Sequence, residues 1–60
     1  MNENELRLMT VEAAKPLAWE LNGDVDCVDP DDLERLLAEV TEANWAEKAQ
    51  ELAELAYWMN

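Results

Sequence analysis

The side chains best placed to do chemistry are the aspartates of residues 24 to 32, a segment with five negative charges and no positive one. They are Asp24, Asp26, Asp29, Asp31 and Asp32. Alternating aspartates are typical of the calcium-binding loops of EF-hands. Counted from Asp24, however, the position that needs glycine is Asp29, and the position that needs a bidentate glutamate is Arg35. We therefore expect no metal site and no cofactor.

Catalytic side chains are scarce. The chain has no histidine, and its only cysteine, Cys27, has no base nearby in the sequence and is flanked by aspartates that disfavour a thiolate. Paired carboxylates can act as acid and base only in a cleft that gives them different environments, which 60 residues rarely enclose. We predict that the protein is not an enzyme. Cys27 is expected to be a half-buried apolar residue beside Val25 or Val28.

The charge balance restricts the partner. Fifteen Asp and Glu against four Lys and Arg give a net charge of -11, which repels nucleic acid and attracts basic surfaces. A second acidic row is predicted on one helical face, where carboxylates recur at intervals of four and three residues. Its members are Glu47, Glu51 and Glu54. We expect a basic protein surface as partner, with no direct contact to nucleic acid.

The elements that carry these carboxylates are predicted to be three helices in one all-α domain covering residues 1–60. Apolar residues recur every three or four positions between Glu3 and Asn22, which is the pattern of an amphipathic helix. They are Leu6, Met9, Ala13, Leu17 and Leu21. Asn22 and Gly23 favour the left-handed backbone that closes a helix.

Pro16 interrupts this first helix, because proline lacks a backbone donor and clashes with the preceding turn. The sequence therefore predicts a kink or break near Lys15. In an alternative arrangement, Thr10 caps a helix that begins at Val11, and residues 1 to 9 form a separate arm or a short first helix.

The second helix has a strong start, with Asp29 as N-cap and Pro30 in the first position. Its apolar face comprises Leu33, Leu36, Leu37 and Val40. A third helix is predicted from Trp45, where Asn44 and Glu47 have the spacing of a capping box. Its apolar face comprises Trp45, Ala49, Leu52, Leu55 or Ala56, and Met59. Asp24 and Asp26 have no predicted structural role.

Three tryptophans are many for a chain of this length. Trp45 shares a face with Ala49 and Leu52, so it is predicted to be in the core. Trp19 and Trp58 lie off the apolar lines of their helices, and we expect one of them to stay partly exposed. We favour the role of covering a short hydrophobic core; the alternative role is a protein interface, including one between two copies of the chain.

Two function classes remain open. In one, the acidic rows imitate the phosphates of nucleic acid and occupy the basic site of a nucleic-acid-binding protein. In the other, the chain is a small acidic adaptor or homodimerisation module, whose charge gives solubility and whose apolar helix faces bind. The charge exceeds the magnitude of about 2 to 8 that suits a small soluble domain, which favours mimicry.

In length, acidity, lack of a catalytic set and its two acidic rows, the chain resembles the small acidic proteins of phages and mobile elements, including anti-CRISPR proteins. The resemblance implies a stoichiometric inhibitor that contacts a host DNA-binding or CRISPR-Cas protein directly. It also implies the host cytoplasm, a location that fits the single cysteine and the acidic N-terminal residues, which are unlike a signal peptide. No membrane-spanning segment is predicted, because no apolar run approaches roughly 18 residues.

Overall fold

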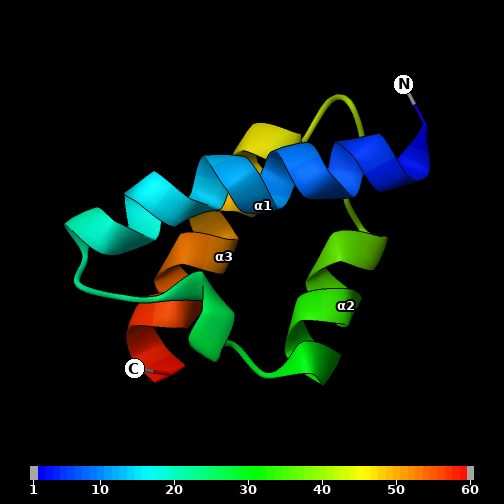
Figure 1. Ribbon diagram of the computed structural model, residues 1–60. Helices are drawn as coiled ribbons and strands as arrows, with labels where there is room; N and C mark the ends of the chain where they lie inside the picture. Colours follow the sequence, from blue (N-terminus) through cyan, green and yellow to red (C-terminus); the bar gives the residue numbers. More distant parts are fainter. Residues whose placement is uncertain (1, 60) are drawn as a thin grey trace.

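The computed structural model describes residues 2–59 and, in this range, is all-helical, as predicted (Figure 1). The first helix, α1 (Glu3–Glu20), begins at Asn2, whose side chain accepts a hydrogen bond of 2.8 Å from the Glu5 amide. Thr10 is buried in the middle of α1, where its hydroxyl donates to the Leu6 carbonyl oxygen at 2.8 Å. The alternative in which Thr10 caps a later helix is therefore wrong.

Pro16 lies inside α1 rather than at its end. The helix continues through it, and its last turns, cyan in Figure 1, slope away from the line of the first turns. The missing amide of Pro16 would have bonded to the carbonyl of Glu12, and both residues are exposed. Water can satisfy that carbonyl, so the proline is tolerated without a break in the helix.

The end of α1 is the Schellman closure that its sequence predicts. Asn22 has a left-handed backbone (φ 63°), its amide donates to the Trp19 carbonyl at 3.0 Å, and the Gly23 amide donates to the Ala18 carbonyl at 2.8 Å. Gly23 then lies against α3: a Cβ on it would be 2.9 Å from the backbone nitrogen of Tyr57. The φ of Gly23 is not positive, so its backbone conformation does not require glycine. The close approach to α3 is what requires it.

Three further elements follow: the 3-10 turn η1 (Val25–Cys27), α2 (Pro30–Ala38) and α3 (Trp45–Met59). Pro30 occupies the first turn of α2, as predicted. The turn between α2 and α3 is held by Asn44, whose Oδ1 accepts from the Thr41 amide at 2.7 Å and whose Nδ2 donates to the Glu39 carbonyl at 3.0 Å. The Asn44 side chain therefore binds back into the turn, rather than reaching forward to Glu47 as the predicted capping box requires.

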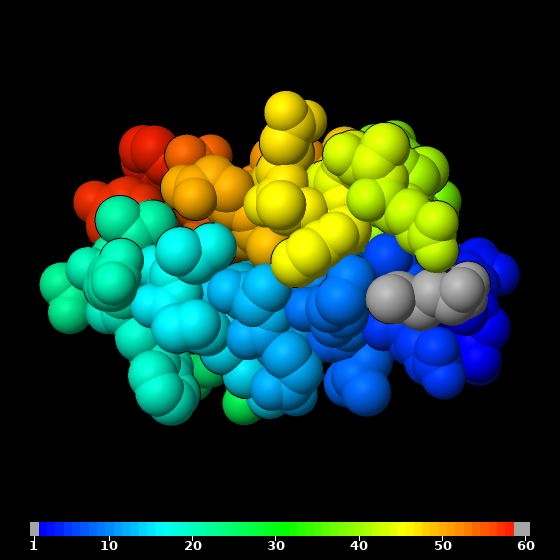
Figure 2. Space-filling view, turned by 90° about the horizontal axis from the view of Figure 1, so that it is seen from above, coloured from blue at the N-terminus to red at the C-terminus, as the bar shows by residue number. Residues whose placement is uncertain are grey.

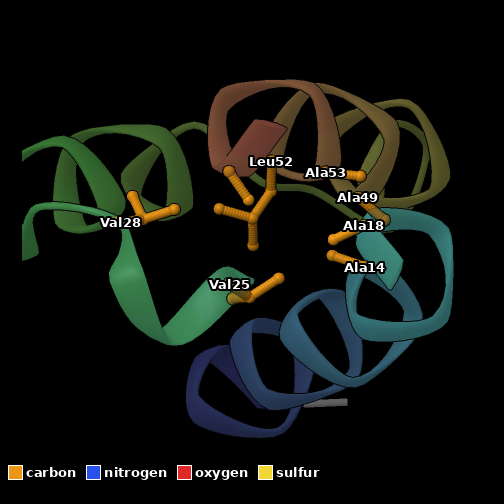
Figure 3. Close-up of a cluster of buried hydrophobic side chains, with 8 residues drawn as sticks. Ala14, Ala18, Val25, Val28, Ala49, Leu52 and Ala53 are labelled. Atoms are coloured by element: carbon orange, nitrogen blue, oxygen red, sulfur yellow. The ribbon is translucent and has the colours of Figure 1, made fainter. Parts of the chain in front are cut away.

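The core forms where α1 crosses α3, with η1 packed against both helices (Figure 1). Small side chains line the crossing: Ala14 and Ala18 of α1 face Ala49 and Ala53 of α3 (Figure 3). Because alanine side chains are short, the axes of α1 and α3 can approach closely. The buried residues of this cluster are Ala14, Ala18, Val25, Val28, Ala49, Leu52, Ala53 and Ala56.

The buried stripe of α1 recurs every four residues and differs from the predicted line. It comprises Leu6, Thr10, Ala14 and Ala18. The larger Leu17 is only half-buried at the side of the crossing, and Leu21 is exposed. In α3, Ala56 rather than Leu55 is fully buried, and Trp45 is half-buried rather than a core residue. The predicted role of the Met59 side chain lies outside the described residues.

The second helix is the least buried element. It has no buried residue, and the predicted apolar positions Leu33, Leu36 and Leu37 are each half-exposed. Among the helices, α3 is the only one with which α2 makes more than slight contact. The stability of α2 therefore depends on its N-cap and on one apolar edge.

Candidate partner-binding surface

The loop aspartates are divided between capping and solvent exposure. Asp24 Oδ1 accepts from the Asp26 amide at 2.9 Å and so caps η1, and Asp29 Oδ1 accepts from the Asp31 amide at 2.9 Å and so caps α2. The cap at Asp29 is confirmed. Asp24 has a structural role that its sequence context did not indicate. Each capping carboxylate keeps its second oxygen for another interaction.

Four of these aspartates are exposed, and Asp32 is half-buried at the start of α2. Their spacing along the chain does not gather them around one point: within residues 2–59, no group of three or more potential ligands could hold a metal ion. Cys27, at the end of η1, is exposed rather than half-buried, because its neighbours Val25 and Val28 take the two inward positions.

The acidic row on α3 is exposed along its length, as predicted, but its members differ in what they contact. Glu51 forms an ion pair of 3.0 Å with Lys48, and Lys48 also pairs with Glu39 at 3.1 Å. Hydrogen bonds to Glu51 and then Glu39 raise the pKa of Lys48 above its usual value. Glu47 and Glu54 have no ion pair to any residue in 2–59. Lys48 thus neutralises the middle of the row and leaves both ends charged.

An open groove between α2 and α3 brings the two acidic regions together at one place. Its volume is about 330 Å³, and Asp32 of α2 and Glu51 of α3 both line it. The remaining lining residues are the apolar Leu36 and Leu55 and the charged Arg35, Glu39 and Lys48. Two cations and three carboxylates nearly balance in this groove. Most of the uncompensated charge therefore lies outside it, and this charge includes the other four loop aspartates, Glu47 and Glu54.

Two of the other three cations are paired within α1, whereas Arg35, which lines the groove, has no ion pair to any residue in 2–59. Arg7 contacts Glu3 at 3.0 Å, and Lys15 contacts Glu12 at 3.4 Å, both within α1. Since the pairs of α1 and Lys48 use carboxylates outside the loop, none of the loop aspartates has an ion-pair partner in residues 2–59. The field of these aspartates is not cancelled by the chain itself.

Exposed aromatic residues are a second feature of the surface. Trp19 is 69% exposed and Trp58 is 79% exposed, so both tryptophans in question are on the surface, where one was expected. Tyr57 is 49% exposed and contacts Trp58 edge to face. Tyr57 was not predicted as a surface aromatic residue, although its position beside Trp58, at the end of an alanine-rich apolar face, indicates one.

Comparison of the chain with protein-family models, with curated proteins and with solved structures finds no match. The resemblance to small acidic inhibitor proteins therefore stays an expectation from size and charge. In the part of the chain that the structure describes, no helix has the length and apolar character needed to cross a bilayer.

Proposed function

We propose that this protein is a non-enzymatic inhibitor that covers the basic, nucleic-acid-binding surface of a host protein, such as a CRISPR-Cas component, with carboxylates in place of phosphates. One observation gives this function its strongest support. Of the eight carboxylates in the two acidic regions, only Glu51 has a cationic partner in residues 2–59, and all but Asp32 are exposed. The unpaired carboxylates can therefore pair with cations of another molecule.

The energetics favour a basic partner. Exposed like charges repel one another and reduce the stability of a small domain. A basic surface removes that repulsion on binding and accelerates encounter through long-range attraction. Glu47, Glu51 and Glu54 project from one face of α3, where successive members of the row start about 5 to 6 Å apart, so they can spread to meet cations that otherwise bind a nucleic-acid backbone.

The experiment compares matched neutral variants. One set converts the unpaired residues, as Glu47→Gln with Glu54→Gln; the control converts two ion-paired residues of α1, as Glu3→Gln with Glu12→Gln. Both remove two negative charges. The partner is captured from a bacterial lysate with and without competing duplex DNA, and its affinity for each variant is measured at low and high salt.

We expect the first set to weaken binding clearly more than the control set, salt to weaken binding further, and duplex DNA to displace the protein. Helicity, followed by circular dichroism, should be the same in all variants. Binding that ignores salt and neutralisation, or a ternary complex with nucleic acid still in its site, would exclude mimicry.

A second function is favoured by a different surface. Leu8 is 62% exposed, and Trp19 lies eleven residues later in α1, about three helical turns on, so the two share one outer face. An adaptor or homodimer would use this face. In that case Trp19→Ala would abolish association, whereas neutral variants of the acidic rows would retain it.

A further inference from the structure

The last two turns of α3 carry an exposed aromatic pair. The ring centroids of Tyr57 and Trp58 are 5.4 Å apart, with an angle of 77° between the rings. Trp58 exposes 79% of its surface, the largest exposed fraction among the large apolar residues described. An indole this exposed contributes little to the core. Its face is available to a ligand.

The backbone beneath this pair is fixed. Gly23 packs so closely on α3 that a Cβ there would meet Tyr57 N at 2.9 Å and Tyr57 Cα at 3.0 Å. Ala56, directly before the pair, is fully buried. In Figure 2 the C-terminal part of α3, orange to red, lies beside the end of α1. The aromatic pair is therefore held on the folded domain rather than on a free end.

A carboxylate lies next to the pair. Glu54 precedes Trp58 by four residues and Tyr57 by three in the same helix, so all three belong to one patch of its surface. Side chains of a helix lean toward its N-terminus, which directs the Trp58 indole toward the turn that carries Glu54. Glu54 is exposed and has no ion-pair partner within residues 2–59.

The charge selects the occupant of this patch. A second copy of the chain would bring another net charge of -11 against the first. An uncharged apolar partner would cover Glu54 and remove its hydration without a compensating bond. A cationic side chain satisfies both groups, because a cation binds the face of an indole and also pairs with a carboxylate.

Among cationic side chains, arginine fits better than lysine. Its guanidinium is planar, stacks on an aromatic face and still directs N–H groups outward from its edge toward a carboxylate. Lysine is a strongly hydrated point charge that cannot stack. We propose that Trp58, Tyr57 and Glu54 form a binding site for an arginine side chain of the basic partner surface. The inference rests on the proposed function and deepens it, since it names the residue type that the partner presents.

The test uses two peptides of equal length and charge, nona-arginine and nona-lysine, with the full chain. Isothermal titration calorimetry gives Kd for wild type, Trp58→Ala, Trp58→Phe and Glu54→Gln, with Trp19→Ala as the control for loss of another exposed tryptophan. We expect wild type to prefer the arginine peptide by about fivefold, the size of a cation–π contact at an exposed site.

Trp58→Ala should abolish this preference, because it lowers the arginine affinity by more than the lysine affinity. Trp58→Phe should retain part of it, Glu54→Gln should reduce it, and Trp19→Ala should leave it intact. Equal affinities for the two peptides in wild type, or a preference that survives Trp58→Ala, would overturn the arginine site. If both peptides still bind and Glu47→Gln with Glu54→Gln weakens both, the proposed function stands without it. Failure of both peptides to bind would overturn the arginine site and count against the proposed function as well.

Discussion

The contact between Gly23 and α3 makes a quantitative prediction for Gly23→Ala. The added Cβ would meet three backbone atoms, Tyr57 N at 2.9 Å, Ala56 C at 3.0 Å and Tyr57 Cα at 3.0 Å. No side-chain rotation relieves a contact with backbone, so the end of α1 must move away from α3. Overpacking of this kind costs about 1–3 kcal/mol.

This cost is large for the domain. Stabilities of about 0.05–0.15 kcal/mol per residue give about 3 to 9 kcal/mol for 60 residues. At about 4–8 °C per kcal/mol for a domain of this size, Gly23→Ala should lower Tm by roughly 5 to 20 °C. Thermal unfolding followed by circular dichroism at 222 nm measures the shift.

A double-mutant cycle tests the reasoning behind that number. Because the close atoms belong to the Tyr57 backbone and not to its ring, Tyr57→Ala should leave the cost of Gly23→Ala unchanged, and the two effects should add. If Gly23→Ala has the Tm of wild type, the close approach is absent in solution. If Tyr57→Ala rescues it, the tyrosine ring rather than the backbone limits the space.

Three further predictions concern the core, the pH dependence and the loop. Leu52 is fully buried, so Leu52→Ala should cost about 2–5 kcal/mol in urea unfolding, whereas Leu8→Ala at an exposed position should cost less than about 0.5 kcal/mol. Hydrogen bonds to Glu51 and Glu39 raise the pKa of Lys48 above 10.5, so the stability from this pairing is present below pH 10.5 and is lost as pH rises through the raised pKa. The urea midpoint of wild type should therefore fall more between pH 10 and about 12 than that of Lys48→Gln, and parallel curves would contradict this. Calcium should leave Tm where magnesium leaves it, and a calcium-specific rise would mean that the loop aspartates do bind the ion.

Several signals that act within a few residues were readable from the sequence, although the Asp24 cap of η1 and the bonds of Asn44 within its turn, which are also local, were not. The Asp29 cap, the Pro30 start and the Asn22 and Gly23 closure each depend on local backbone chemistry, and the structure has all of them. Pro16 depends on whether the freed carbonyl of Glu12 reaches water, which the helix pattern does not reveal. Of the kink or break predicted there, the structure shows a helix that continues through the proline and whose last turns slope away from the line of the first turns.

The burial of individual residues and the ion pair between helices depend on how the helices pack against one another. The predicted line through Leu17 and Leu21 assumed that the largest apolar residues mark the core, but the crossing of α1 and α3 selects small ones, so Ala14 and Ala18 are buried and Leu21 is exposed. In the candidate site, the exposure of the acidic rows was predictable. The Lys48–Glu39 pair was not, because Glu39 lies nine residues earlier and meets Lys48 only through the turn between two helices.

The absence of buried residues in α2 has a consequence for motion. An element that exposes little buried surface when it opens requires less free energy to open than the domain as a whole, and the core contacts of α2 are limited to half-buried side chains such as Leu33 and Leu36. We expect the amides of α2 to exchange with solvent deuterium faster than those of the middle of α3, where Leu52 and Ala53 are fully buried. Asp31 and Asp32 move with α2, whereas Glu54 stays on the rigid helix. Local opening of α2 would therefore shift Asp31 and Asp32 relative to Glu54 while the crossing of α1 and α3 stays folded.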